Sequence, residues 1–408
     1  MVLGEVMRGA KARVLLFCWL GWAFDFYDLI LFAFVKLAVQ QDLGIDVAQL
    51  AWIEGATLGA SAIGGFAFGR MADRVGRRRA LSTSILFFSA GALCTGLADG
   101  VGTLLCARVL TGLGVGGEWG VGHAAVAEAY PERLRGRAAG LLQAATPVGM
   151  GLAALVGCFV APSVGWRAAY VASALPALLV LMARWAMPGD GDERVGARVR
   201  PGLDMLRGAL LRPSLVLFTV LALHMTGFWC CFAWLPSALL KDGGFSLGFV
   251  GTFHVSLALV HVFADVAFGW CADRFGRRTV FVAFSALFAL GLSAMGLGFE
   301  RLADDFVLFA FVLATVGLGA GTWSAFGVFF AELYPRGVRA TAASGLYNLS
   351  RGVQLFTLPM MGFLFASTGT YAVALWVGVA TALLSALTLV ALPRSATSEA
   401  EAVASAAR

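Results

Sequence analysis

The sequence predicts an all-α integral membrane protein with twelve transmembrane helices in two related six-helix bundles. The first observation is the composition, because 60% of the 408 residues are hydrophobic and only 13% are charged, whereas soluble domains carry about 25% charged residues. The second observation is an internal repeat. The segment GRMADRVGRRR from Gly69 recurs as GWCADRFGRR from Gly269. A second motif, AEAYPERLRG from Ala127, recurs as AELYPRGVRA from Ala331, so two independent motifs divide the chain into similar halves.

Apolar stretches of about 20 residues, enough to cross the hydrocarbon core, follow one another along the chain. The first stretch follows basic residues, as a signal peptide does, but it is too long and lacks a small-residue cleavage site, so we expect it to be retained. Polar, Gly- or Pro-marked connections separate the later stretches. The predicted spans are 13–38, 47–70, 80–98, 101–128, 138–161, 167–187, 214–240, 249–271, 279–298, 306–331, 341–366 and 371–392.

Basic residues predict the orientation of these spans, because Lys and Arg concentrate on the cytoplasmic side. All but six of the 30 Lys and Arg residues fall in the termini and in the connections on one side. We therefore expect both termini to be cytoplasmic, in an inner or plasma membrane. The opposite side receives Lys36, Arg167, Lys241 and Arg301, and the remaining two, Arg108 and Arg351, fall within spans.

The repeat and the composition also predict the domain organisation. We expect residues 1–187 to form an N-terminal bundle and residues 214–393 a C-terminal bundle. A Gly-, Asp- and Arg-rich cytoplasmic linker, 188–213, joins them, and 394–408 form a short cytoplasmic tail. A monomer embedded in the lipid bilayer is the expected state.

Several function classes are excluded by the sequence. The net charge of +6 comes from short basic clusters between apolar stretches, without the basic face that nucleic-acid binding requires. The seven cysteines lie in apolar segments without metal-ligand spacing, so we expect packing roles, no metal and no cofactor. No nucleophile, base and orienting residue share a recognisable spacing, so an enzyme is not expected.

The repeated G-x-x-x-D-R-x-G-R-R motif resembles the signature between helices two and three of major facilitator superfamily transporters. Arg108, followed by Gly112 and Gly114, resembles the helix-four motif of the same family. The resemblance covers nearly the whole chain and implies the major facilitator fold.

Three shorter motifs resemble one group within that superfamily, the carboxylate:proton symporters. They are FDFYD from Phe24, GGEWG from Gly116 and YNLSR from Tyr347. The group includes sialate, aromatic acid and metabolite branches, and the resemblance implies cotransport of an organic acid with a proton.

The repeated turns after the second and eighth spans are candidates for a cytoplasmic latch. The family resemblance implies that the turn aspartate lies against the start of helix eleven, where the helix dipole favours an anion, and that nearby arginines pair with Glu128 and Glu332. Such contacts would close the cytoplasmic side in one state and break in the other; alternatively, the turns only retain the loops inside by their charge. The expected latch residues are Gly69, Asp73, Arg74, Gly76, Arg77, Glu128, Arg137, Asp273, Arg274, Arg277, Glu332 and Arg339.

Ionisable residues inside the bilayer are costly, so each one is a functional hypothesis. Asp25 lies twelve residues beyond Arg13, about 18 Å at 1.5 Å per residue, and Asp28 shares its face. Deep in the spans, four acids face only two arginines, so at least one acid is expected to exchange protons. The four acids are Asp25, Asp28, Glu118 and Asp265, and the arginines are Arg108 and Arg351. Alternatively, Arg108 neutralises one acid and the others line a hydrated cavity. The expected proton-coupling residues are Asp25, Asp28, Glu118, Arg108, Asp265 and His261.

Arg351 is the expected substrate anchor, because its planar fork of donors suits a carboxylate. Tyr347, Asn348 and Gln354 lie on the same side of that helix. Alternatively Arg351 pairs with Asp25 or Asp265, which is compatible with exchanging that acid for substrate. The expected substrate-binding residues are Arg351, Asn348, Tyr347, Gln354, Tyr27, Gln143 and Trp323.

The predicted function is import of a small carboxylate anion together with H+ by alternating access. A proton-coupled antiporter that exports organic acids or drugs is one alternative. A transporter-like sensor is another, although such proteins usually carry a long cytoplasmic extension. The sequence leaves open whether the acid is a lactate-like monocarboxylate, an aromatic acid or sialic acid.

Overall fold

The computed structural model describes residues 6–7, 9–179, 182, 186–187, 208–334 and 336–390, with most side chains in these ranges. The described residues form helices and turns, without strands. Most of the expected linker, 188–213, and the whole expected tail, 394–408, lie outside the described residues. The domain boundaries therefore stay a prediction.

The helices of the first half run back and forth across the molecule. The fifth span is broken into consecutive helices, and the sixth is described as far as Leu179. The elements are α2 (Gly9–Leu43), α3 (Val47–Val75), α4 (Arg77–Gly96), α5 (Val101–Ala129), α6 (Glu132–Gln143), α7 (Ala145–Leu155), η1 (Val156–Val160), α8 (Ala161–Val164), α9 (Trp166–Ala172) and η2 (Leu175–Leu178).

The second half repeats this arrangement, with breaks in its first, fourth and fifth spans. The elements are η4 (Gly208–Leu210), α11 (Leu211–Phe232), α12 (Leu235–Lys241), α13 (Leu247–Phe275), α14 (Arg277–Leu297), η5 (Phe299–Arg301), α15 (Phe306–Ala320), η6 (Gly321–Trp323), α16 (Ser324–Leu333), α17 (Arg336–Gly352), α18 (Gln354–Thr368) and α19 (Val373–Val390). The predicted all-α, twelve-span fold is thus confirmed, although α2 extends several residues beyond both ends of its predicted span.

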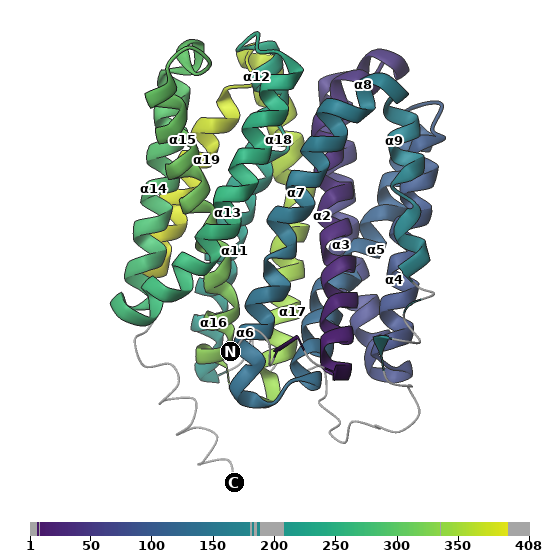
Figure 1. Ribbon diagram of the computed structural model, residues 1–408, viewed down its shortest axis with the longest axis vertical. Helices are drawn as coiled ribbons and strands as arrows, with labels where there is room; N and C mark the ends of the chain where they lie inside the picture. Colours follow the sequence, from purple (N-terminus) through teal and green to yellow (C-terminus); the bar gives the residue numbers. More distant parts are fainter. Residues whose placement is uncertain are drawn as a thin grey trace.

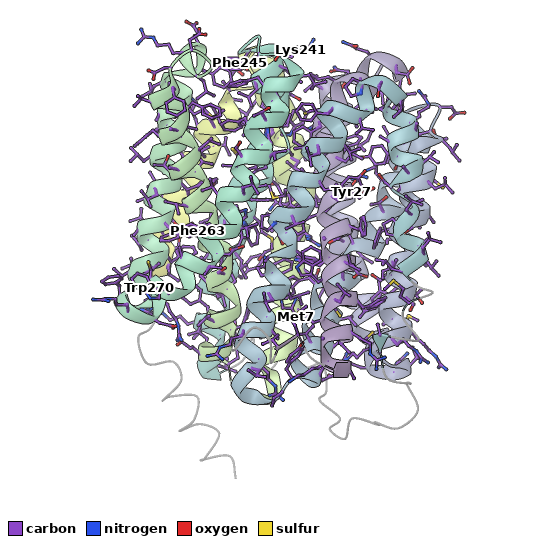
Figure 2. All side chains as sticks on the ribbon, viewed as in Figure 1. Met7, Tyr27, Lys241, Phe245, Phe263 and Trp270 are labelled. Atoms are coloured by element: carbon purple, nitrogen blue, oxygen red, sulfur yellow. The ribbon has the colours of Figure 1, made fainter. Side chains whose placement is uncertain are left out.

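The two halves lie side by side as two bundles (Figure 1). They meet where α7 packs against α13 and where α3 packs against α17 and α18. Seven helical segments within the described ranges are long and apolar enough to cross a membrane. Large apolar side chains such as Phe263 and Trp270 point outward from α13 (Figure 2), as expected for a surface that contacts lipid.

Arginine-rich turns mark one end of the molecule. Helices α3 and α13 stop at Gly76 and Gly276, whose φ angles of 98° and 86° favour glycine. Helices α4 and α14 begin directly afterwards. We call this end the basic end and the opposite one the far end.

Close helix packing repeats between the halves. A Cβ added to Gly91 would lie 2.3 Å from Oγ1 of Thr111, and one added to Gly291 would lie 2.3 Å from Oγ1 of Thr315. These glycines therefore let α4 approach α5, and α14 approach α15, at the same place. The sequence repeat is thus also a repeat of tertiary contacts.

Hydrogen bonds at the far end follow the same repeat. Asp42, near the end of α2, accepts a hydrogen bond of 3.1 Å from Nε1 of Trp166 at the start of α9. Asp242, which follows α12, accepts one of 2.7 Å from the backbone N–H of Ala372, just before α19. Each half therefore ties its first span to its sixth with an aspartate.

Packing of α5 on α3 predicts an effect on stability. We expect Gly116→Ala to destabilise the protein by about 1–3 kcal/mol, because a Cβ there would lie 2.0 Å from the carbonyl oxygen of Ser61. Gly102→Ala on the same helix is the control, since its Cβ would meet nothing within 4 Å. Thermal unfolding in detergent, followed by tryptophan fluorescence, measures both. Equal unfolding midpoints would show that the α3–α5 contact tolerates a methyl group.

Candidate functional site

The candidate site is built from charged side chains buried within the helices. Six of them are at most 3% exposed, although each can carry a charge. Such groups need partners, because an unpaired charge in an apolar interior is costly. The six are Asp25, Asp28, Lys36, Arg108, Glu118 and Arg351.

Arg351 and Asp25 face each other across the two bundles. Arg351 is the penultimate residue of α17, next to the break before α18, and Asp25 lies in the middle of α2. The two groups attract each other, but no guanidinium nitrogen of Arg351 and no carboxylate oxygen of Asp25 is hydrogen-bonded to a described residue. The rings of Trp22 and Tyr347 lie 5.7 Å and 5.3 Å from the guanidinium carbon. The guanidinium of Arg351 can therefore donate hydrogen bonds to a ligand that lies against the rings of Trp22 and Tyr347.

Asp28 makes a direct ion pair inside the first bundle. Its Oδ2 accepts a hydrogen bond of 2.7 Å from Nη1 of Arg108 on α5. The Arg108 guanidinium also lies 5.1 Å from the ring of Phe32. Asp25 and Asp28 were expected to share a face, but residues three apart are separated by about 60° around a helix. That rotation directs them to different partners in different bundles.

Glu118 lies between α2, α4 and α5. Its Oε1 accepts a hydrogen bond of 2.8 Å from Ser84. Its Oε2 lies 2.6 Å from where a Cβ on Gly21 would be, so the absence of a side chain there makes room for the carboxylate. The next residue, Trp119, stacks on Tyr347 with ring centroids 3.9 Å apart and planes 5° apart. This stack joins the bundles beside Arg351.

Asp265 and His261 lie apart from this group, in the second bundle. The Asp265 carboxylate accepts a hydrogen bond of 2.8 Å from Ser324. His261 Nε2 lies 3.9 Å from Asp265 Oδ1, so the four-residue spacing brings them together, though only loosely. No three His, Cys, Asp or Glu side chains within the described ranges are placed to hold a metal ion.

Two of the predicted ligands, Asn348 and Gln354, lie near Arg351 in the eleventh span, which consists of α17 and α18. Asn348 donates a hydrogen bond of 3.0 Å to the carbonyl of Ser344, and its amide packs directly against Gly65 of α3. Gln354 donates to Thr226 at 3.3 Å. Both amides thus lie where α17 and α18 meet neighbouring helices.

The remaining predicted ligands, Tyr27, Gln143 and Trp323, come from other helices. Tyr27 accepts a hydrogen bond of 3.1 Å from Ser173 and points into the first bundle. Gln143 donates to Thr146 in its own span at 3.3 Å. Trp323 packs against His224 in the second bundle, with ring centroids 4.7 Å apart. The Trp323 ring also lies 6.4 Å from that of Tyr347. Of these three residues, Trp323 therefore borders the aromatic group beside Arg351, whereas Tyr27 and Gln143 make their hydrogen bonds within the first bundle.

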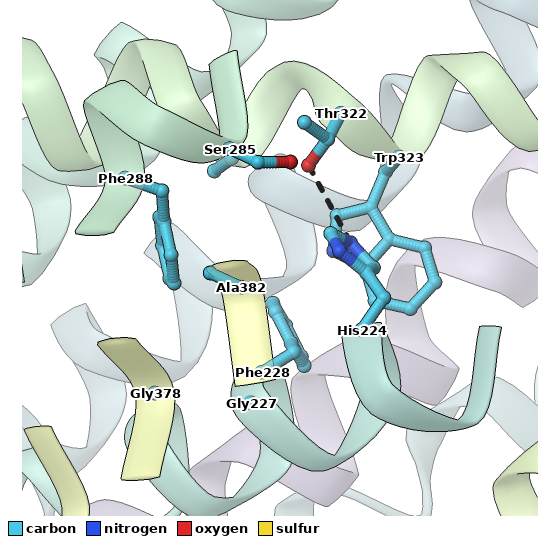
Figure 3. A pocket seen from close by; sticks show the side chains of 10 residues that line it. His224, Gly227, Phe228, Ser285, Phe288, Thr322, Trp323, Gly378 and Ala382 are labelled. Atoms are coloured by element: carbon cyan, nitrogen blue, oxygen red, sulfur yellow. Dashed lines mark hydrogen bonds between the residues drawn. The ribbon is translucent and has the colours of Figure 1, made fainter. Parts of the chain in front are cut away.

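Two small cavities accompany these residues. One lies inside the second bundle, where His224 Nε2 is 3.5 Å from Thr322 Oγ1 and Ser285 lies opposite (Figure 3). The other lies between the bundles and is lined by Phe34 and His254 among others. Both are lined mainly by apolar side chains.

At the basic end, arginines join neighbouring helices of each bundle. Arg77 donates to Asp73 at 2.9 Å and pairs with Glu128 of α5 at 3.1 Å. Arg277 pairs with Glu332 of α16. The described partner of Asp73 is thus Arg77 in its own turn. The first side chains of α17, including Arg339, lie outside the described residues, so a contact of Asp73 with α17 stays a prediction.

The other predicted latch residues lie at or near the surface of the basic end. Arg274 lies over the ring of Trp270 at 5.9 Å. Arg74, Arg137 and Asp273 are exposed. A Cβ on Gly69 would meet nothing within 4 Å, so close packing does not explain this glycine.

Lys36, which the sequence assigns to the side opposite the basic clusters, is a buried residue near the far end. Because α2 continues to Leu43, Lys36 lies inside the helix and is 0% exposed. Its Nζ lies 2.6 Å from Oε1 of Glu54 on α3 and 3.5 Å from the ring centroid of Trp234 in the second bundle. The available signal was position: Lys36 is eleven residues beyond Asp25, about three helical turns, and so shares its face.

Comparisons with known proteins indicate to which family the chain is similar. A model described as Major Facilitator Superfamily matches residues 17–263 and 217–407. A putative metabolite transport protein of Haemophilus influenzae is 30% identical over 361 residues, covering 84% of this chain and 86% of that protein. A probable 4-methylmuconolactone transporter of Cupriavidus pinatubonensis is 30% identical over 363 residues, covering 86% and 83%.

Two further comparisons extend this likeness. A putative niacin/nicotinamide transporter of Bacillus subtilis is 28% identical over 369 residues, covering 89% of this chain and 91% of that protein. Among solved structures, a D-xylose-proton symporter superposes with a TM-score of 0.77 at 19% identity, covering 95% of this chain and 99% of that one. At this identity the structural likeness concerns the fold alone.

The buried ion pair of the first bundle predicts a second stability effect. We expect Asp28→Ala to destabilise the protein by about 3–5 kcal/mol, because it leaves Arg108 charged and unpaired. Replacing both residues by Leu removes the unpaired charge and is expected to restore much of the loss. Thermal unfolding in detergent compares the variants. A double variant no more stable than Asp28→Ala would contradict the pairing argument.

Proposed function

The chain belongs to the Major Facilitator Superfamily, and from this premise we propose that it is a proton-coupled symporter that imports a small organic acid. Family membership makes it an integral membrane transporter and not an enzyme. Similar proteins are described as transporters of 4-methylmuconolactone, of niacin or nicotinamide, and of gentisate, which supports an organic acid as the proposed substrate class. The observation that carries the proposal is the buried, unbonded Arg351 guanidinium opposite Asp25.

Arg351 is proposed as the carboxylate anchor. Its three guanidinium nitrogens are buried and make no hydrogen bonds to described residues. A carboxylate matches this planar fork with two parallel hydrogen bonds. Tyr347, Trp22 and Trp119 would then contact the body of the acid, and Asn348 and Gln354 its polar groups. Aromatic surfaces beside a cation favour a planar acid.

Asp25 is proposed as the proton carrier. Arg351 is the cation that attracts Asp25 when this acid is ionised in the empty protein. A substrate carboxylate on Arg351 takes over that attraction and leaves Asp25 without hydrogen-bond donors in an apolar interior. The charged form is then costly, so Asp25 takes up a proton as substrate binds. One anion and one proton therefore move together.

The other buried acids have supporting roles in this proposal. Asp28 stays paired with Arg108 and holds α2 against α5, while Glu118 is a second proton site beside Gly21. Asp265 and His261 form a separate polar pair in the second bundle. One proton per monoanion is electrically neutral, so a tenfold proton gradient supplies about 1.4 kcal/mol.

We propose that residues 1–187 and 214–393 are the two bundles that rock against each other, with the basic end in the cytoplasm of an inner or plasma membrane. Both Asp25 and Arg351 come from one chain, which favours a functional monomer. Arg77 with Glu128, and Arg277 with Glu332, brace the helices that close the cytoplasmic side.

Substitution of Arg351 tests the anchor. We expect Arg351→Ala to weaken binding of the transported carboxylate about 100-fold, because two charge-assisted hydrogen bonds contribute roughly 3 kcal/mol together. Arg351→Lys keeps the charge but loses the fork, so an intermediate affinity is expected. Thermal shift with nicotinate, benzoate, lactate and sialate, each at graded concentration, measures binding.

The matched ligand controls are nicotinamide and benzamide, which keep the ring but lack the negative charge. Their weaker effect is expected to be nearly the same on wild type and on Arg351→Ala. A carboxylate that stabilises both proteins equally would remove Arg351 as the anchor.

Substitution of Asp25 tests proton coupling. In proteoliposomes, we expect Asp25→Asn to abolish accumulation of labelled acid driven by a pH gradient, because the amide cannot carry the proton. Exchange of labelled for unlabelled acid across the membrane is expected to continue. Asp42→Asn, at the surface of the far end, is the control and is expected to accumulate the acid normally. Gradient-driven accumulation by Asp25→Asn at the wild-type rate would exclude Asp25 as the carrier, and efflux driven by proton entry would favour an exporter.

A further inference from the structure

A cation–π contact joins the two bundles at the far end. The Lys36 ammonium lies 3.5 Å from the ring centroid of Trp234, and both side chains are 0% exposed. Lys36 belongs to α2 of the first bundle, whereas Trp234 lies between α11 and α12 of the second bundle. A cation over a tryptophan face is attracted most strongly where water is excluded. We infer that Lys36, Glu54 and Trp234 form a gate that closes the far end between the bundles.

The ion pair of this gate lies within a single bundle. Lys36 Nζ and Glu54 Oε1 are 2.6 Å apart, on α2 and α3. Separation of the bundles therefore breaks the contact with Trp234 but leaves the ion pair intact. Water reaching Lys36 on opening replaces the ring, so neither charge is left without a partner in either state. The gate can therefore open and close without leaving a buried charge unpaired.

Trp234 is held in place from its own bundle. Its ring is 4.5 Å from the ring of Phe365 and nearly parallel to that of Tyr371 at 5.8 Å. The α11–α12 break, followed by Pro236 in the first turn of α12, fixes the backbone at this point. When the second bundle rotates, Trp234 moves with it as part of a rigid aromatic group.

The repeat places a related contact on the other side of the interface. Positions 34 and 234 correspond at an offset of 200, as do positions 54 and 254. Phe34 of α2 contacts His254 of α13, with ring centroids 4.9 Å apart. Each half thus sets an aromatic residue of its first span toward the other bundle. Trp234 contacts the charged Lys36, whereas Phe34 contacts a histidine ring. The Lys36–Trp234 contact is therefore the stronger of the two closing contacts.

Two native cysteines can report opening. Both Cys230 and Cys231 are buried, one turn before Trp234. Cys230 interacts with Thr357 of α18 and with Glu54 across the bundle interface. Cys231 instead lies against Gly378 of α19, inside the second bundle. Opening at the far end should therefore expose Cys230 and leave Cys231 protected.

The inference rests on the proposed alternation of the bundles, and its test needs neither substrate nor proton gradient. Two full-length backgrounds each retain one of these cysteines and replace the other six. In proteoliposomes, a charged, membrane-impermeant methanethiosulfonate is added from the far end. We expect Trp234→Leu to raise the labelling rate of Cys230 at least tenfold, Trp234→Phe to raise it much less, and Cys231 labelling to stay unchanged.

The double variant Lys36→Met with Glu54→Gln removes the cation without leaving an unpaired acid. It is expected to match Trp234→Leu, and combining all three substitutions should add nothing further. Should Trp234→Leu fail to assemble, the double variant carries the test alone. Asp42→Asn, which removes a contact internal to the first bundle at the same end, is the matched control and should leave Cys230 protected.

The gate is overturned if both gate variants leave Cys230 protected, if Cys231 labels equally fast, or if the effects of the substitutions multiply. If the gate variants label faster at Cys230 but the wild-type protein accumulates no acid, the gate is supported and the proposed symport is rejected. If the gate variants label Cys230 no faster while the wild-type protein shows Arg351-dependent uptake, the symport is supported and the gate is rejected.

Discussion

A charge placed among apolar helices must be neutralised nearby, and this constraint organises the interior of the protein. Arg108 meets Asp28 directly, inside the first bundle. Lys36 meets a glutamate of the adjacent helix in the same way. Arg351 and Asp25 differ, because they belong to different bundles and attract each other without a hydrogen bond. Relative movement of the bundles changes this third interaction most directly, which makes it suitable for coupling binding to conformation.

The two halves share their packing but not their charges. Paired glycines bring corresponding helices together in both halves, at Gly91 and Gly291. By contrast, the position of Glu118 is occupied in the second half by Trp323, and that of Glu54 by His254. At these two positions the first half therefore carries an acid and the second half an aromatic ring. An interface between such halves brings unlike chemistry face to face.

The seam between α3 and the eleventh span (α17 and α18) is built from small residues. Gly55 of α3 lies against Pro359 and the neighbouring backbone, and Gly65 lies against the amide of Asn348. Gly352, at the break after Arg351, lies against Ala62. Small residues allow close backbone approach without interlocking side chains. Arg351 thus lies beside an interface of small residues, next to the break in its own helix.

The sequence by itself determined the fold class, the approximate spans, the repeat and most of the residues that carry charge inside the membrane, because hydropathy, motif spacing and composition are local properties. It also predicted Arg351 as a substrate-binding residue and Asp25 as a proton-coupling residue. Only the tertiary structure decided their partners: Asp28 turns to α5, Tyr27 points into its own bundle, and Lys36 is buried against Trp234. The partner of a buried charge depends on how each helix is rotated and where it ends, and those are set by packing between distant segments.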